Sequence, residues 1–90
     1  MANRLSLSKA VQQDIERLPG NMRQRVRRTI AELATDPRPQ AAKTMQDELA
    51  GYYRIRLDNY CIIYTIDDDV VLVEVIRVAR RTSQTYEGLP

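Results

Sequence analysis

Apolar residues in the first part of the chain follow two different periods. The two-residue alternation over residues 4–7 predicts a short strand, and Ser8 is placed to cap a helix that follows it. Apolar residues spaced three and four positions apart then predict two amphipathic helices. The first helix would bury Val11, Ile15 and Leu18, and the second Met22, Val26, Ile30 and Leu33. The first third of the chain therefore predicts a strand followed by a helical hairpin.

Turn-forming residues mark where these helices should begin and end. Pro19-Gly20 should end the first helix, and Asn21 should cap the second. Asp36-Pro37 should end the second helix, because a residue before proline is pushed out of the α region. Residues 36–51 then connect the helices to the rest of the chain, with a short helical turn expected within 42–49.

The alternation from Tyr52 to Tyr64 predicts a β-hairpin around a two-residue turn, Asp58-Asn59. The core face of this hairpin would pair Leu57 with Tyr60, Ile55 with Ile62 and Tyr53 with Tyr64. The other face would pair Arg56 with Cys61, Arg54 with Ile63 and Tyr52 with Thr65. A slip of one residue would bury both arginines, so the pattern fixes the register.

A third strand should follow an acidic turn at residues 67–69. Residues 70–78 form a nearly continuous apolar run, which indicates a strand covered on both faces. Glu74 interrupts this run and either holds Arg54 or Arg56 in place or lies at an exposed position. The predicted fold is α+β, one domain over residues 1–90: an N-terminal strand, a helical hairpin and a three-stranded antiparallel meander.

Composition excludes several classes of protein. Ninety residues can enclose one core, and no run approaches the length needed to span a membrane. The chain begins without a secretory signal pattern and has a single cysteine, so we expect a cytoplasmic protein. With no histidine and one cysteine, the usual zinc sites and histidine-dependent nucleophiles are excluded. No cofactor, metal or membrane partner is expected.

Three features carry competing interpretations. The arginines of the helices are best read as a solvated outer face. The acidic run at residues 67–69 is a charged turn rather than a metal site, because adjacent residues in a hairpin turn cannot converge on one ion. Cys61 is either a thiol whose pKa is lowered by Arg56 or, as we favour, a small half-buried packing residue.

Basic and aromatic residues gather on the face of the hairpin opposite the core. Arginine supplies most of the basic charge, and its planar fork suits bidentate binding of phosphate. Aromatic rings add a surface on which a nucleic-acid base can stack. The residues concerned are Arg54 and Arg56, flanked by Tyr52, and the later cluster of Arg80, Arg81 and Tyr86. This pattern favours a surface that contacts nucleic acid.

Residues 49–57, 59–68 and 75–81, followed by Tyr86, resemble the RelE branch of the RelE/ParE toxins of bacterial toxin-antitoxin systems. The resemblance covers nearly the whole chain and includes the break at Asp36-Pro37. It implies a toxin, monomeric when alone, that enters the ribosomal A site and cuts messenger RNA with the 2′-hydroxyl of the RNA as nucleophile. It also implies a cognate antitoxin that holds the toxin inactive.

The resemblance assigns roles to individual residues. Arg54 or Arg56 would orient or deprotonate the 2′-hydroxyl, Arg81 would neutralise the phosphorane, and Tyr86 would stack on or orient the base. Tyr52 and Arg80 are expected to bind RNA. The position of Cys61, where RelE has a basic phosphate contact, belongs to the same surface. A ParE-like poison of DNA gyrase and a catalytically weak module that binds antitoxin or nucleic acid are the alternatives.

Overall fold

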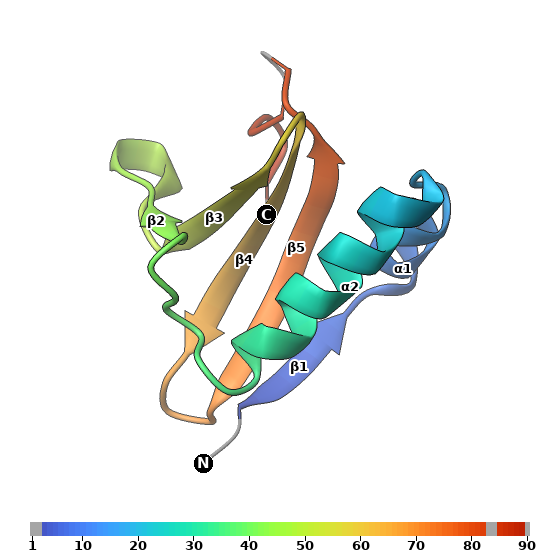
Figure 1. Cartoon of the computed structure of the whole chain (residues 1–90). Coiled ribbons are helices and arrows are strands. Elements are labelled where there is room, and N and C mark those ends of the chain that lie inside the picture. The colour runs from blue at the N-terminus through green and yellow to red at the C-terminus, as the bar shows by residue number, and fades with distance from the viewer. Residues whose placement is uncertain (1–2, 83–84, 90) are drawn as a thin grey trace.

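A five-stranded sheet with two helices on one face forms the domain (Figure 1). The structure is a computed structural model that describes residues 3–82 and 85–89. In chain order the elements are β1 (Arg4–Leu7), α1 (Lys9–Glu16), α2 (Gly20–Leu33), β2 (Lys43–Thr44), the 3₁₀ helix η1 (Asp47–Leu49), β3 (Tyr52–Leu57), β4 (Tyr60–Asp67) and β5 (Leu72–Arg80). The strand order is β1-β5-β4-β3-β2, with β1 parallel to β5 and the other pairs antiparallel. The α+β prediction is confirmed.

The helical hairpin begins as predicted, but its second helix starts early. Ser8 caps α1, because its hydroxyl accepts a hydrogen bond from the amide of Val11 at 3.2 Å. The N-cap of α2 is Pro19 rather than Asn21, and the carbonyl of Pro19 accepts the amide of Arg23 at 2.8 Å. Asn21 therefore lies inside the first turn of α2, and the expectation that it caps this helix is wrong.

The predicted register of the β3–β4 hairpin is confirmed at all six pairs. Asp58 adopts a left-handed backbone conformation in the two-residue turn, with φ of 54°, which aspartate tolerates better than most residues. The third strand begins two residues later than predicted, at Leu72. The preceding turn extends through Val71, whose φ is +57°, and leaves Val70 58% exposed.

A bulge in β5 decides which side chains face the helices. Val75 lies opposite Tyr64 on the core face, but the next pair joins Arg77 to Ile63, so Ile76 is an extra residue. Without this bulge, regular alternation would place Arg77 on the same face as Val75. The bulge therefore turns Arg77 out of the main core.

The connection between α2 and β3 contains a strand that the sequence pattern missed. Residues 43–44 form β2, which pairs with β3 at the sheet edge, and the expected helical turn is the short helix η1. Arg38 fastens this connection to the β4–β5 turn through an ion pair with Asp68 at 2.9 Å. The hydroxyl of Tyr64 donates to the carbonyl of Pro37 at 2.8 Å. These bonds hold the connection against the sheet.

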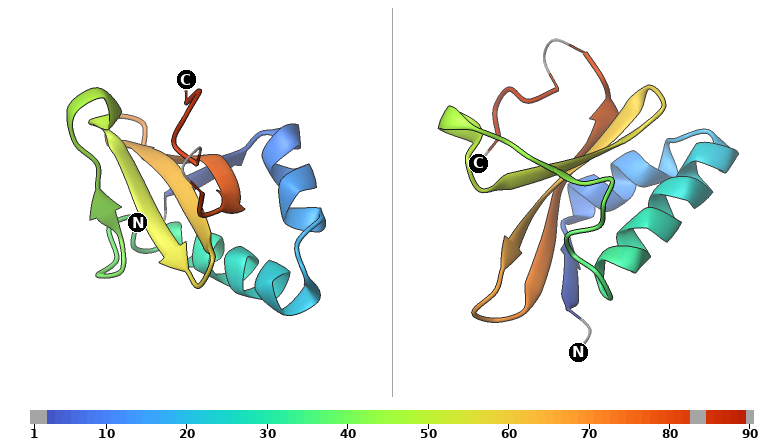
Figure 2. Two further views of the ribbon diagram at one scale, coloured as in Figure 1. Left: turned by 90° about the horizontal axis from the view of Figure 1, so that it is seen from above. Right: turned by 60° about the vertical axis from the view of Figure 1, so that its left-hand side comes forward.

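The two faces of the sheet are covered differently. Apolar residues of α1 and α2 pack on one face and form the main core with Ile55, Ile62 and Tyr64. Residues 85–89, the C-terminal segment, lie across the opposite face (Figure 2). On that face Cys61 and Ile63 are fully buried. Among the described residues no helix is long and apolar enough to cross a membrane.

Candidate nucleic-acid interface

Two open hollows lie side by side on the face of the sheet that carries the C-terminal segment, and they share Arg56. The larger, of about 340 Å³, is lined by Arg56, Arg81, Thr82, Thr85 and Tyr86. The smaller, of about 210 Å³, is lined by Ala41, Lys43, Arg54 and Arg56. None of the described residues that line them is acidic. We call this region the basic hollow.

Strand β3 supplies Arg54 and Arg56, two residues apart and therefore on one face. Arg56 is exposed and Arg54 is half-buried. Lys43 of β2 lies directly opposite Arg54 and extends the line of positive charge to the sheet edge. The sequence pattern does not point to Lys43, because a two-residue strand leaves no periodic signal. The sequence shows only that a lysine occurs within the connection between α2 and β3.

The turn between β3 and β4 holds Arg81 at the other end of the basic hollow. The amide of Arg81 donates to the carbonyl of Asn59 at 2.6 Å, and its guanidinium donates to the carbonyl of Asp58 at 3.0 Å. The carboxylate of Asp58 in turn pairs with Arg25 of α2 at 2.6 Å. Arg81 remains exposed, and a guanidinium has five N–H donors. Free donors are therefore available to a phosphate.

Tyr86 reaches the larger hollow from the C-terminal turn, residues 85–88. It is half-buried, whereas the side chain of the preceding residue, Thr85, is only 4% exposed. The hydroxyl of Thr85 donates to the carbonyl of Arg80 at 2.8 Å and accepts the amide of Thr82 at 2.6 Å. The structure thus brings together Arg54, Arg56, Arg81 and Tyr86, the four residues to which the resemblance assigns catalytic roles.

Cys61 lies opposite Arg56, as predicted, but its side chain is fully buried rather than half-buried. Burial raises the pKa of the Cys61 thiol and outweighs the charges of Arg56, Arg81, Arg54 and Arg77, which lower it. A packing role is therefore supported over a reactive thiol. A fully buried thiol offers no surface to RNA, which corrects the expectation that Cys61 is an RNA contact.

Tyr52 and Arg80 lie outside the residues that line the basic hollow. Tyr52 is half-buried opposite Thr65, and exposed Arg80 places its guanidinium 6.0 Å from the ring centre of Tyr60. Glu74 is exposed and forms no ion pair with Arg54 or Arg56 among the described residues, so the exposed alternative holds. No group of candidate metal ligands occurs in residues 3–82 and 85–89.

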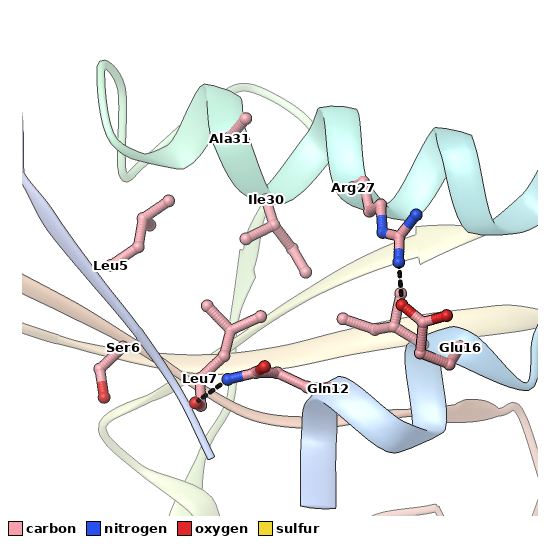
Figure 3. Close-up of a pocket in the computed structure, with 9 residues that line it drawn as sticks. Leu5, Ser6, Leu7, Gln12, Glu16, Arg27, Ile30 and Ala31 are labelled. Atoms are coloured by element: carbon pink, nitrogen blue, oxygen red, sulfur yellow. Dashed lines mark hydrogen bonds and ion pairs between the residues drawn. The ribbon is translucent and has the colours of Figure 1, made fainter. Parts of the chain in front are cut away.

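A third hollow, of about 650 Å³, lies elsewhere, between β1, α1 and α2 (Figure 3). Leu5, Leu7 and Ile30 give it apolar walls. Its charged groups, Arg27 and Glu16, are paired with each other, and the Gln12 side chain donates to the carbonyl of Leu7 at 3.0 Å. Without unpaired basic groups, this hollow suits a phosphodiester less well than the basic hollow does.

Comparison with known proteins identifies the family. A family model described as the ParE toxin of the type II toxin-antitoxin system parDE matches residues 5–85. The chain belongs to this toxin family. It is therefore a toxin of a type II toxin-antitoxin system, of the RelE/ParE superfamily. Among curated proteins, none matches the chain.

Solved structures of RelE toxins share the fold. A chain of the toxin-antitoxin complex RelBE2 from Mycobacterium tuberculosis is 26% identical, with a TM-score of 0.78 over 90% of this toxin and all of that chain. A mutant of the E. coli toxin RelE in the free state is 25% identical, with a TM-score of 0.75, 96% of this toxin and 92% of that chain being covered. The archaeal RelE-RelB complex from Pyrococcus horikoshii, at 21% identity, has a TM-score of 0.79 over 92% of this toxin and 99% of its own chain.

Proposed function

We propose that this toxin inhibits translation by cutting messenger RNA on the ribosome. The basic hollow is the observation that supports this proposal most. It gathers Lys43, Arg54, Arg56 and Arg81 with one tyrosine, and no acidic side chain among the described lining residues repels a phosphodiester. Such a surface suits a single strand of RNA, whose phosphates need cations and whose bases stack on aromatic rings.

Cleavage would proceed without a metal. The 2′-hydroxyl gives up its proton to water and its oxygen attacks the adjacent phosphorus. The bond to the 5′-oxygen of the next nucleotide breaks, that oxygen takes up a proton from water, and a cyclic phosphate remains on the 5′ fragment. Arginine stays protonated at any physiological pH and is a poor base. We therefore assign Arg54, Arg56 and Arg81 to stabilising the charge of the phosphorane rather than to removing the proton. Tyr86 would hold the base so that the 2′-oxygen lies in line with the bond that breaks.

A cognate antitoxin is the proposed protein partner. The chain belongs to a family of two-component toxin-antitoxin systems, and the RelE relative from M. tuberculosis was solved as a toxin-antitoxin complex. We propose that an antitoxin binds this toxin in the same way and holds it inactive. Co-expression with its cognate antitoxin should yield a complex that withstands purification and no longer arrests translation.

Cleavage of ribosome-bound messenger RNA by purified toxin tests the proposed activity. Wild-type toxin should cut within the codon at the A site and should leave the same RNA intact without ribosomes. Arg56→Met should lose most of this activity. Arg28→Met, which removes an exposed arginine from α2 outside the basic hollow, is the matched control and should retain it. Equal loss in both variants would count against the proposed site.

A second function, poisoning of DNA gyrase, is favoured by one observation: the family model that matches the chain is that of ParE. In this case the basic hollow would serve to bind protein or DNA without chemistry. A cleavage assay with purified gyrase and plasmid DNA separates the two functions. A gyrase poison traps double-strand breaks in the DNA, whereas an RNA endonuclease leaves gyrase unaffected.

A further inference from the structure

Arg77 is a half-buried arginine of β5 that the proposed cleavage chemistry does not use. The bulge in β5 turns it away from the main core, and it lies opposite Ile63 on the face that carries the C-terminal turn. Its side chain is half-buried. It does not line the basic hollow, which lies beside it. Its position therefore calls for a role other than direct contact with RNA.

The guanidinium of Arg77 holds the main chain on both sides of Tyr86. Its Nη1 donates to the carbonyl of Thr85 at 2.8 Å and to the carbonyl of Glu87 at 2.5 Å. Gly88, next in sequence, has a φ of +69°, and a Cβ built there would lie 4.0 Å from Nη2 of Arg77. The chain thus curls around one guanidinium at the residue before and the residue after Tyr86.

The buried hydroxyl of Thr85 provides a second, independent attachment. It ties the same turn to the carbonyl of Arg80 and to the amide of Thr82. The bonds from Arg77 are charge-assisted, which strengthens them relative to bonds between neutral groups. Two separate groups thus fix one residue, Tyr86, beside Arg56 and Arg81.

We infer that Arg77 is a positioning residue for Tyr86: its guanidinium clamps the C-terminal turn so that the tyrosine ring enters the basic hollow. The inference rests on the proposed function in so far as Tyr86 acts in cleavage. Arg77 itself need not touch RNA. Its removal should displace the ring, and a small displacement of a positioned group can lower a rate by about a hundredfold.

Fluorine NMR on toxin labelled with 3-fluorotyrosine tests the placement of Tyr86 without reference to activity. The chain has five tyrosines, and Tyr86→Phe identifies the Tyr86 resonance by its disappearance. Arg77→Met keeps the length of the side chain and removes the donors, and Thr85→Val removes the hydroxyl at nearly constant volume. In both variants the Tyr86 resonance should move toward the position of free fluorotyrosine and sharpen, while the other four remain in place.

Kinetics of ribosome-bound cleavage with the same variants tests the consequence. Arg77→Met should lower kcat by about tenfold or more and leave KM nearly unchanged. Arg77→Lys should restore part of the rate, because an ammonium group also donates to carbonyls. Arg28→Met, which removes the same charge at an exposed site on α2, should behave as wild type in both experiments.

The NMR and kinetic results together decide between the possible roles of Arg77. An unmoved Tyr86 resonance in Arg77→Met overturns the inference, and a raised KM with that result would make Arg77 an RNA contact. A displaced resonance with undiminished kcat also overturns it. A displaced resonance in a toxin whose wild type cuts no RNA would uphold the clamp and overturn the proposed function. Should Arg77→Met fail to fold, Arg77→Lys decides by the same criteria: a partly displaced Tyr86 resonance with a kcat below wild type upholds the inference, and an unmoved resonance overturns it.

Discussion

Replacement of Cys61 by arginine puts the burial of this residue to a direct test. The site is fully closed to solvent, and the charges of Arg56, Arg81, Arg54 and Arg77 already act on it. A fifth guanidinium would therefore be buried without a partner and among like charges. A buried unpaired charge costs about 3–5 kcal/mol, and the excess side-chain volume adds about 1–3 kcal/mol.

This cost is large relative to the stability of a small domain. Domains of this size unfold with about 5–15 kcal/mol in total. Each kcal/mol shifts the melting temperature of a domain of 60–100 residues by about 4–8 °C. Cys61→Arg should therefore melt at least about 15 °C below wild type or fail to fold, whereas Cys61→Val should lose less than about 1.5 kcal/mol.

Thermal and urea unfolding, followed by circular dichroism, measure both variants. Melting of Cys61→Arg within a few degrees of wild type would show that the new side chain reaches solvent and that Cys61 is not closed off as described. Cleavage by that folded variant should in addition rise above wild type if the added charge meets RNA. In that event the position is part of the interface after all.

Three further changes have expected outcomes. Arg81→Ala should lower cleavage by about a hundredfold or more while costing about 1 kcal/mol of stability in urea unfolding, and an aggregated variant would show that Arg81 is structural. Lys43→Met should weaken binding to ribosome-bound messenger RNA and reduce the slope of log affinity against log salt concentration, whereas an unchanged slope would place Lys43 outside the interface. The third change, at Tyr64, affects stability alone. Burial raises the pKa of the Tyr64 hydroxyl from 10.0 to about 12. The free energy of unfolding that this neutral hydroxyl contributes is therefore complete below pH 10 and should be lost as the pH rises through 12. Tyr64→Phe should cost about 1 kcal/mol at neutral pH, through the unpaired carbonyl of Pro37, and should remove that alkaline loss; a loss that persists in Tyr64→Phe would contradict this assignment.

Local patterns predicted the parts of the fold that local physics determines. The alternation around Asp58-Asn59 gave the hairpin register, because a one-residue slip would exchange the buried and exposed faces. The spacing of apolar residues gave both helices. The start of β5 was misplaced because Val70 and Val71, although apolar and β-branched, belong to the turn. There the carbonyl of Val71 accepts the amide of Arg4 at 2.8 Å, and this tertiary context outweighs β propensity.

Features formed by contacts between distant segments were missed. Strand β2 is two residues long and exists only through its pairing with β3. The bulge at Ile76 leaves no mark in the apolar run, yet it decides where Arg77 lies. The position of residues 85–89 over the sheet was also missed. These residues lie on the face that carries Cys61, which was expected to be half-buried and is fully buried. Composition and alternation carry no information on such a return.

The candidate site was predicted in part for the same reason. Arg54 and Arg56 share a face by strand geometry alone, so their proximity followed from the sequence. The meeting of Arg81 and Tyr86 with Arg56 in one hollow depends on the tertiary fold and came from the resemblance. Neither strand geometry nor the family resemblance pointed to Lys43 or Arg77, whose positions are visible only in the structure.

Mapping of RNA 5′ ends in cells after induction of the toxin is the sharpest test of messenger RNA cleavage on the ribosome. We predict new 5′ ends within codons of translated messages, and their absence from the same messages when Arg56→Met is induced. Growth arrest by Arg28→Met should match that of wild type. Intact messages together with gyrase-dependent breaks in DNA would contradict the account and establish the gyrase poison instead.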